Sequence, residues 1–266
     1  MKYYASFPTT ASNLMLNRAI NYGDGMFETM LVNKQSIPLW DLHYQRLTSG
    51  LERFKIDPVP EQFIRNKILS LAYDKKSYIA KLMVFRSDEK RGYGSQSRKA
   101  DYYITVSPYN ITTTQAHALT VSPIILAKQH KLAGIKHLNR LEQVLAAQNI
   151  IDTPYQDALM LDEDNNIIET ISKNIVLIKG DQLYTPHLNE CGVYGVGLRW
   201  LQQQDYTIHW KKIEFDSLSE YDGLMVSNSI RGFNQITHID KLIHFKQNLN
   251  LINEINHKWN RYIKSL

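Results

Sequence analysis

Apolar residues are spaced differently in successive parts of the first hundred residues, and the spacing predicts strands, then two helices, then two further strands. Short apolar runs broken by turns fill residues 2–40, which is typical of strands. Apolar side chains recur about one helical turn apart in residues 41–55 and 60–73, so a helix is expected in each range. Two β-like runs follow, at 78–85 and 101–106. These elements predict an N-terminal α/β unit.

A polar stretch without periodicity separates this unit from the rest of the chain. Residues 108–115 are rich in threonine, and stretches of that composition between periodic segments are loops. We therefore place a linker at 111–117, between an N-terminal domain at 1–110 and a C-terminal domain at 118–266.

The second half of the chain predicts strands interrupted by a helix. A β-like run covers 119–126, and Leu138, Leu141 and Leu145 then recur at the spacing that loads one face of a helix. Two hairpins follow, and their strands are expected at 158–161, 167–171, 175–178 and 182–184. Because strands and helices alternate without a regular βαβ period, the expected fold class is α+β, or mixed α/β.

Composition describes an ordinary globular protein and excludes several classes of function. Hydrophobic residues make up 43% and charged residues 21% of the 266 positions, which is usual for soluble domains. No apolar run is long enough to cross a bilayer, and the first residues lack the apolar core of a signal peptide. The single cysteine, Cys191, excludes an internal disulfide and a cysteine-based zinc cage. We expect a cytoplasmic protein without a metal site.

The charge of the chain is positive but dispersed. The formal net charge is +5 and the pI is about 9.0, which favours anionic ligands. No block of lysine and arginine marks a nucleic-acid arm. We therefore expect neither a nucleic-acid partner nor a membrane, and the charge is compatible with a phosphate-bearing cofactor and an acidic substrate.

Lys136 is the lysine best suited to chemistry. It lies between the β-like run and the helical leucines, where rigid flanks at a strand-to-helix junction can aim an amine into a cleft. Partial desolvation disfavours the charged form of a lysine, and a neutral amine can attack a carbonyl to form a Schiff base. A surface lysine near a helix start is the alternative, and it is the commoner case for an arbitrary lysine.

Glu169 is the second unusual residue, because it stands between apolar neighbours on an expected strand. The period of two places Ile167, Glu169 and Ile171 on one face. A buried carboxylate must be paired or protonated, and a protonated pyridine nitrogen would be a suitable partner. The alternative is an edge strand whose glutamate faces water.

Arg46 and a glycine-rich turn could both bind an anion. Arg46 lies on the helix expected from residue 41, with Asp41 as a candidate N-cap and His43 on the same face. The planar guanidinium can grip a phosphate through paired hydrogen bonds. The glycines of 192–197 precede a helix-like run, where backbone N–H groups can bind an anion. A solvated salt bridge and a structural turn are the respective alternatives.

The loop at 86–99 is rich in cations and glycine. Within it, Arg91 could bind a substrate carboxylate and Tyr93 could offer a hydroxyl group. A mobile loop that faces solvent explains the same composition, so the sequence leaves both interpretations open.

Together, a lysine, a strand carboxylate, a helical arginine and a glycine-lined helix start are the parts of a pyridoxal-phosphate site. Their order resembles the class IV aminotransferase family, the fold-type IV group of pyridoxal-phosphate enzymes. The resemblance extends from Asn17 to about Ile236 and includes the segment RAINYGDGMFET at 18–29. It implies a small N-terminal α/β domain and a larger C-terminal domain with a barrel-like sheet.

The resemblance also implies roles for individual residues. Lys136 matches the Schiff-base lysine, Glu169 the carboxylate at the pyridine nitrogen, and Arg46 the phosphate-binding arginine. The other cofactor-binding positions implied by the resemblance are Asn174, Val196, Gly197, Ser229 and Ile230. The substrate-binding positions implied by it are Arg91, Tyr93 and Phe27.

Within the family, the run HLNRLEQVL after Lys136 and the triplet Arg91-Gly-Tyr93 are similar to the aminodeoxychorismate lyases. This similarity implies conversion of 4-amino-4-deoxychorismate to 4-aminobenzoate and pyruvate, a step toward folate. It also implies a homodimer with a functional link to an aminodeoxychorismate synthase. Two alternatives stay open: a class IV transaminase acting on D- or branched-chain amino acids, and an inactive member that binds a ligand or partner.

Overall fold

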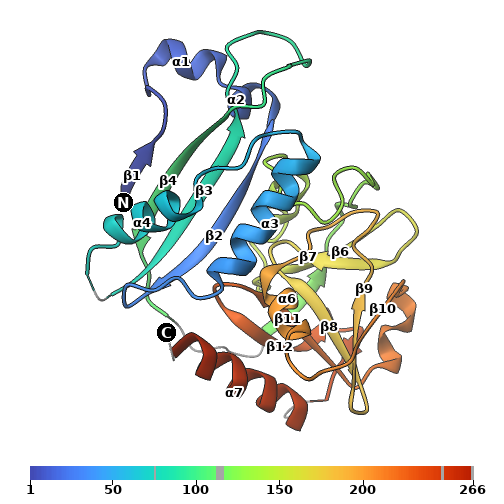
Figure 1. Cartoon of the computed structure of the whole chain (residues 1–266). Coiled ribbons are helices and arrows are strands. Elements are labelled where there is room, and N and C mark those ends of the chain that lie inside the picture. Colours follow the sequence, from blue (N-terminus) through green and yellow to red (C-terminus); the bar gives the residue numbers. More distant parts are fainter. Residues whose placement is uncertain (75, 112–116, 247–248, 265–266) are drawn as a thin grey trace. The chain divides into compact units, whose positions relative to one another are not determined.

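The computed structural model describes residues 1–74, 76–111, 117–246 and 249–264 (Figure 1). Apart from the last residue, unit 1 comprises Met1–Ile111 and Ile135–Asn139, and unit 2 comprises Thr112–Gly134 and Arg140–Ser265. Most of the linker predicted at 111–117 lies outside the described residues. The segment that carries Lys136 was assigned from the sequence to the C-terminal domain, but it packs with unit 1.

In the described residues, unit 1 is built on an antiparallel four-stranded sheet in the order β1-β4-β3-β2. Its strands are β1 (Lys2–Ala5), β2 (Gly25–Asn33), β3 (Ser77–Arg86) and β4 (Ala100–Pro108). Two short helices, α1 (Ala11–Leu16) and α2 (Arg18–Tyr22), lie between β1 and β2, where the sequence predicted mainly strands. The helices predicted at 41–55 and 60–73 are α3 (Trp40–Arg53) and α4 (Glu61–Leu71).

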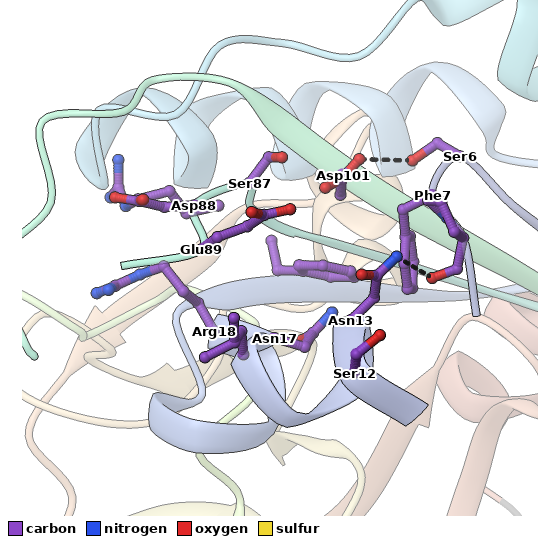
Figure 2. A pocket seen from close by; sticks show the side chains of 14 residues that line it. Ser6, Phe7, Ser12, Asn13, Asn17, Arg18, Ser87, Asp88, Glu89 and Asp101 are labelled. Atoms are coloured by element: carbon purple, nitrogen blue, oxygen red, sulfur yellow. Dashed lines mark hydrogen bonds between the residues drawn. The ribbon is translucent and has the colours of Figure 1, made fainter. Parts of the chain in front are cut away.

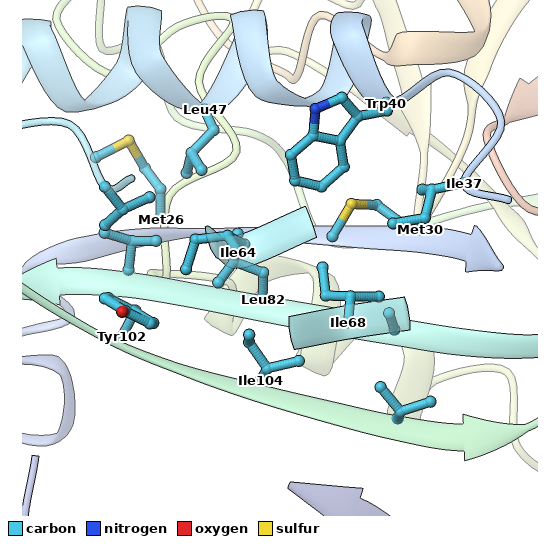
Figure 3. Close-up of a cluster of buried hydrophobic side chains, with 14 of the residues drawn as sticks. Met26, Met30, Ile37, Trp40, Leu47, Ile64, Ile68, Leu82, Tyr102 and Ile104 are labelled. Carbon is cyan, nitrogen blue, oxygen red and sulfur yellow. The ribbon is translucent and has the colours of Figure 1, made fainter. Parts of the chain in front are cut away.

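Alternate residues of the unit 1 sheet face α3 and α4 and form its core (Figure 3). Each buried aliphatic side chain of this kind stabilises a fold by roughly 1.5–3 kcal/mol. The core residues labelled in Figure 3 include Met26, Met30, Leu47, Ile64, Ile68, Leu82 and Ile104. The intervening residues of β2 and β3, such as Phe27 and Lys81, are only partly buried on the other face of the sheet.

The start of α3 differs from the prediction. Asp41 was expected as the N-cap, but the chain turns at Leu39, whose φ is 64°, and the helix begins at Trp40. Asp41 lies in the first helical turn, where its negative charge still interacts favourably with the helix dipole.

Among the described residues, unit 2 contains a nine-stranded sheet, and six of its strands close into a barrel in the order β8-β11-β12-β5-β6-β7. The ring closes because β7 pairs with β8 as well as with β6. The strands of the ring are β5 (His117–Val121), β6 (Ala158–Leu161), β7 (Ile167–Thr170), β8 (Asn174–Lys179), β11 (Gly223–Asn228) and β12 (Gly232–Ile239). The strands β9 (Gln182–Pro186) and β10 (Ile208–Lys211) continue the sheet beyond β8, and β13 (Ile243–His244) pairs with β12.

The barrel strands pack around an apolar cluster of their own. The members of this cluster that come from the ring are Leu119, Leu159, Leu161, Ile167, Ile175, Leu177, Leu224, Val226, Ile236 and Ile239. The helices of unit 2 are α5 (Leu141–Gln148), α6 (Val196–Gln202), a 3₁₀ helix (Phe215–Glu220) and α7 (Asn250–Lys264). The mixed α/β class and the barrel-like sheet are therefore confirmed. In the described parts of the chain, no helix has the length and apolar character to cross a membrane.

The leucine stripe predicted after Lys136 does not face the core. The helix α5 begins at Leu141, three residues after Leu138, and Leu141 and Leu145 are 68% and 45% exposed. The residues that α5 buries are Gln143 and Ala146. The leucine spacing correctly predicted a helix. Its buried face carries Gln143, because that side chain hydrogen-bonds the buried carboxylate of Glu169.

Candidate active site

Lys136 lies on an extended segment that continues the unit 1 sheet beyond β2. The backbone N–H of Phe27 donates a hydrogen bond of 3.0 Å to the carbonyl oxygen of Lys136. Met26 and His137 form an antiparallel bridge, which makes Lys136 the cross-strand neighbour of Phe27. The sequence predicted a strand-to-helix junction here, whereas α5 starts five residues later at Leu141. The backbone of Lys136 is therefore positioned by β2.

Two ammonium groups lie near the ring of Phe27. The Nζ atom of Lys136 is 4.4 Å from the ring centroid, and the Nζ atom of Lys81, on β3, is 4.9 Å from it. The quadrupole of an aromatic ring attracts a cation over its face by about 0.5–2 kcal/mol. Phe27 therefore orients the amine of Lys136, and Lys81 adds a second positive charge on the same side of the sheet.

A buried carboxylate on β2 holds Arg46. Glu28 and His43 are each 1% exposed and Arg46 is 7% exposed. The Nε and Nη2 atoms of Arg46 donate to the two oxygens of Glu28 at 2.8 and 2.5 Å. The Nδ1 atom of His43 lies 2.6 Å from Oε2 of Glu28. The alternative of a solvated salt bridge at Arg46 is therefore wrong, because the pair is enclosed in unit 1.

The protonation states of this trio follow from its geometry. Burial raises the pKa of Glu28, but the charge of Arg46 and hydrogen bonds from His43 and Arg46 outweigh burial and lower it to about 2. Burial lowers the pKa of His43, against the opposing effect of Glu28. At neutral pH the imidazole is therefore neutral and donates its Nδ1–H to an ionised Glu28. This carboxylate fixes the plane of the Arg46 guanidinium.

A β-bulge directs Glu169 away from the interior of the barrel. Leu161 pairs with Ile167 and Met160 pairs with Glu169, which leaves Ile168 as an extra residue in β7. Neighbouring residues of a strand point to opposite faces, so Ile167 and Glu169 also face opposite sides. The prediction that these two residues share a face is therefore wrong. Bulges often change the direction of a side chain next to a functional site.

Glu169 is buried and hydrogen-bonded within unit 2. Its side chain is 5% exposed. Oε2 accepts a hydrogen bond of 2.9 Å from the backbone N–H of Val193, and Oε1 accepts one of 3.4 Å from the amide of Gln143. Because β7 pairs with a strand on each side, the alternative of an exposed edge strand is wrong. The carboxylate is thus held by donors from two separate segments.

Asn174 and two glycines shape the turn that leads into α6. The Nδ2 atom of Asn174 donates to the carbonyl oxygen of Val193 at 2.7 Å. A Cβ atom on Gly195 would overlap Oδ1 of Asn174, so a larger residue cannot occupy this position without moving the asparagine. Gly192 has a φ of 78°, which glycine adopts readily. The turn therefore presents the Val193 N–H to the carboxylate on β7.

The residues expected to bind a phosphate include the first two residues of α6, Val196 and Gly197. A Cβ atom on Gly197 would lie 3.3 Å from Oγ of Ser227, which is tight. Ser227 is 1% exposed, and its hydroxyl has no hydrogen-bond partner within the part of the chain that the structure describes. A buried polar group without a partner is costly. A hydroxyl next to the backbone of a glycine therefore fits the phosphate of pyridoxal phosphate.

Ser229 and Ile230 lie in the turn between β11 and β12. The backbone N–H of Ile230 donates to Oδ1 of Asn228 at 3.1 Å. The expected contact between this N–H and a phosphate thus requires the Asn228 side chain to turn away.

Arg91 and Tyr93 lie on the loop between β3 and β4, and both side chains are exposed, that of Tyr93 by 90%. The backbone of the loop is anchored from within unit 1. The buried side chain of Arg18, on α2, donates to the carbonyl oxygens of Gly92 and Tyr93 at 3.0 and 2.8 Å. The loop therefore combines a fixed tip with outward-facing side chains.

A cavity of about 310 Å³ lies beside the start of this loop in unit 1 (Figure 2). Residues that follow β1, residues from α1 and α2, residues from the end of β3 and the loop after it, and Asp101 of β4 line it. The rings of Phe7 and Phe85 pack edge to face there, with centroids 5.4 Å apart. None of the residues expected to bind cofactor or substrate lines the cavity, so it is separate from the predicted site.

The predicted site residues divide between the two units. Unit 1 contains Phe27, Arg46, Arg91, Tyr93 and Lys136, and unit 2 contains Glu169, Asn174, Val196, Gly197, Ser229 and Ile230. In the described ranges, no cluster of three or more His, Cys, Asp or Glu residues could hold a metal ion.

The residues of the site that the sequence analysis missed include Glu28, Lys81, Gln143 and Ser227. A signal for Glu28 was present, because the period of two puts it on the same face of β2 as Met26 and Met30, in the core. Gln143 and Ser227 gave no such signal, because only the packing of distant segments makes them buried.

Comparisons with known proteins agree on one family. A family model described as amino-transferase class IV matches residues 25–239. An aminodeoxychorismate lyase from Vibrio harveyi is 30% identical over 234 residues, which are 84% of this chain and 86% of that protein. A crystal structure of 4-amino-4-deoxychorismate lyase from Pseudomonas aeruginosa has a TM-score of 0.86 at 27% identity, covering 97% of this chain and 98% of that one.

A branched-chain aminotransferase from Thermoproteus uzoniensis has a TM-score of 0.83 at 17% identity, covering 98% of this chain and 94% of that one, so it shares the fold. The family model and the Vibrio harveyi relative both extend over most of the chain. The chain therefore belongs to the class IV aminotransferase family of pyridoxal-phosphate-dependent enzymes.

Proposed function

We propose that this enzyme is an aminodeoxychorismate lyase, which converts 4-amino-4-deoxychorismate to 4-aminobenzoate and pyruvate and so contributes to folate synthesis. The observation that carries the proposal is the amine of Lys136, held by the β2 backbone and the Phe27 ring at 4.4 Å. The chain that carries this amine is similar to lyases from two organisms, and each similarity covers more than four fifths of the chain.

Lys136 has two tasks in this proposal. Its Nζ atom would hold pyridoxal phosphate covalently. The amine of Lys136 would also remove the proton from the amine-bearing ring carbon of the substrate. As an ammonium group, Lys136 next donates that proton to the departing enolpyruvyl group, which leaves as pyruvate. One proton is thus taken and one is returned, and the ring that remains is aromatic.

Bound pyridoxal phosphate would supply an electron sink for this elimination. Glu169 would accept a hydrogen bond from the protonated pyridine nitrogen, and a hydrogen bond to a charged group contributes about 1.5–3 kcal/mol. The N–H of Val193 and the amide of Gln143 keep the carboxylate in position for this contact, at 2.9 and 3.4 Å. Asn174 supports it indirectly, through the Val193 carbonyl.

The phosphate would be bound by Arg46, by the backbone of Val196 and Gly197, and by the turn at Ser229 and Ile230. The buried hydroxyl of Ser227 extends this set. A helix start and an arginine with a fixed plane are both suited to a phosphate. Glu28 contributes indirectly, because it holds the guanidinium of Arg46.

The substrate would be recognised by Phe27, Arg91 and Tyr93. Chorismate derivatives carry two carboxylates, so a surface with several positive charges favours them. Lys81 adds a charge next to Phe27 that the sequence analysis did not assign. Positive charges that converge on a site also speed the arrival of an anionic substrate.

We also propose a homodimer, with a functional link to an aminodeoxychorismate synthase that supplies the substrate. The apolar side chains of Leu141, Val144 and Leu145 on α5 are 68%, 51% and 45% exposed, which is compatible with a covered surface in an assembly. Light scattering coupled to gel filtration would give the mass of the particle. A monomer at micromolar concentration would refute this part.

The central test is a comparison of two assays on the purified protein with added pyridoxal phosphate. With 4-amino-4-deoxychorismate, we expect release of pyruvate and an aromatic amine in equal amounts. With D- or branched-chain amino acids and 2-oxoglutarate, we expect little glutamate. Efficient glutamate formation without pyruvate release would instead favour a class IV transaminase, and no activity in either assay would favour an inactive member of the family.

A further inference from the structure

The helix α2 holds the tip of the loop that carries Arg91 and Tyr93. The guanidinium of Arg18 donates to the carbonyl oxygens of Gly92 and Tyr93 at 3.0 and 2.8 Å. The hydroxyl of Tyr22 accepts a hydrogen bond of 2.9 Å from the N–H of Gly92. Hydrogen bonds from both ends of this short helix therefore fix the peptide groups around Gly92.

Ring contacts and the backbone conformation of Gly92 also stabilise the position of the loop tip. The rings of Tyr22 and Tyr93 have centroids 5.5 Å apart, and the guanidinium of Arg18 lies 4.8 Å from the Tyr22 ring. Gly92 has a φ of 97°, a conformation that suits glycine. A hydrogen bond from the hydroxyl of Ser95 to the carboxylate of Asp88 closes the base of the loop. The tip is therefore ordered by specific contacts, while the Arg91 side chain stays exposed.

Arg18 is itself fixed by the segment before β2. Its side chain is among those that line the cavity shown in Figure 2. Arg18 is 3% exposed, and its Nε atom donates to Oδ2 of Asp24 at 2.8 Å. The same oxygen accepts a hydrogen bond of 2.9 Å from Nε of Arg86 at the end of β3. A buried arginine with a fixed carboxylate has little freedom to move, so it can hold two carbonyl oxygens of a neighbouring loop in place.

We propose that Arg18 and Tyr22 are positioning residues that order the loop tip in advance, so that Arg91 and Tyr93 are presented to a carboxylate of the substrate. This inference rests on the proposed function, because the carboxylate-binding role of Arg91 is part of that proposal. Ordering a flexible loop costs conformational entropy. A loop that is ordered before binding does not incur that cost when the substrate arrives, so the substrate binds more tightly.

The ordering of the loop tip by Arg18 and Tyr22 can be tested without measuring catalytic activity. Trypsin cleaves after Lys90 and Arg91, which are adjacent and exposed. Tyr22→Phe removes one hydrogen bond and keeps the ring, whereas Arg18→Lys keeps a positive charge but cannot bridge both carbonyls. Each lost hydrogen bond should raise the open population, and with it the rate of cleavage, by about fivefold to tenfold. Arg98→Lys is the matched control, because its ion pair with Asp57 is solvent-exposed.

The effect on the substrate is measured on the same proteins loaded with pyridoxal phosphate. Chorismate carries both carboxylates but no amine, so its binding by calorimetry reports recognition without turnover. We expect its Kd to rise about tenfold in Tyr22→Phe and Arg18→Lys, in line with the loss of preorganisation. In the lyase assay KM should rise by a similar factor while kcat and the affinity for pyridoxal phosphate stay within about twofold.

Two different failures can be told apart. If wild-type protein turns over the substrate but the variants show unchanged cleavage by trypsin, or faster cleavage with unchanged Kd and KM, the positioning role is refuted. If wild-type protein neither turns over 4-amino-4-deoxychorismate nor binds chorismate, the proposed function is wrong and the inference fails with it. Cleavage of the variants would then show only that α2 orders the loop.

Discussion

Replacing Glu28 with glutamine tests the electrostatic account of unit 1. Glutamine has nearly the same shape but no charge, and its NH₂ group is a donor that faces the donors of Arg46 or His43. In Glu28→Gln the buried guanidinium of Arg46 therefore loses the carboxylate that holds it. Removing one partner of a buried ion pair destabilises a protein by about 3–5 kcal/mol.

The pKa of Glu28 gives a second route to the magnitude. The pKa falls from 4.5 to about 2 in the folded protein. At about 1.4 kcal/mol per pKa unit, this fall corresponds to roughly 3 kcal/mol of stability from the ionised carboxylate. The two approaches agree on the size of the effect.

The same pKa fixes the pH dependence. The fold favours the ionised form of Glu28, so its contribution is present in full above about pH 4.5. It is lost as the pH falls from about 4.5 toward about 2, where the folded protein takes up the proton. Glutamine does not titrate, so the stability difference between wild type and Glu28→Gln should shrink as the pH falls below 4.5.

Calorimetric unfolding of the cofactor-free protein at pH 7, 5, 4 and 3.5 is the assay. At pH 7 we expect Glu28→Gln to lower Tm by roughly 10 °C, since each kcal/mol shifts Tm by about 2–4 °C in a chain of this size. Glu52→Gln is the control on α3, because that side chain is exposed. A Tm equal to wild type at pH 7, or a difference that stays constant down to pH 3.5, would refute the reasoning.

Three further substitutions test the site. Lys136→Ala should lower turnover by at least about a thousandfold and prevent covalent attachment of the cofactor, which absorbance spectra detect. Ser227→Ala should leave the free energy of unfolding of the cofactor-free protein within about 1 kcal/mol of the wild-type value, because the Ser227 hydroxyl has no partner in the described residues. In a titration, the same substitution should weaken cofactor binding about fivefold. Gly195→Ala should destabilise the protein by about 1–3 kcal/mol in chemical denaturation, because the added Cβ atom overlaps Asn174. Gly94→Ala is the control and should be nearly neutral, because its Cβ atom would meet no atom within 4 Å.

Local periodicity was sufficient to predict the elements whose burial repeats regularly. The strands β3 and β4 and the helices α3 and α4 lie within one or two residues of the predicted ranges. Each packs one face against the other layer of unit 1 and buries residues at the spacing of its own period there. The short helices α1 and α2 were missed, since helices of five or six residues are too short to show a period.

The direction of side chains was predicted less well than the elements themselves. The strand β7 was predicted at 167–171, but its bulge at Ile168 reverses the direction of Glu169. A bulge depends on pairing with β6, which the sequence of β7 alone does not contain. The face of α5 was wrong for a similar reason, since burial of Gln143 depends on the carboxylate it reaches from a distant strand.

The two buried carboxylates show how much of a site the sequence can reveal. Glu28 and Glu169 both interrupt apolar runs of expected strands, and an unpaired charge in such a place would be very costly. This cost led us to expect a partner for a buried Glu169, and the same reasoning applies to Glu28, which the sequence analysis missed. The sequence does not identify the donor, because Arg46 and Val193 reach the carboxylates only through the tertiary fold. In both strands the charged residue at a buried position belongs to a polar network, and its partners have to be read from the structure.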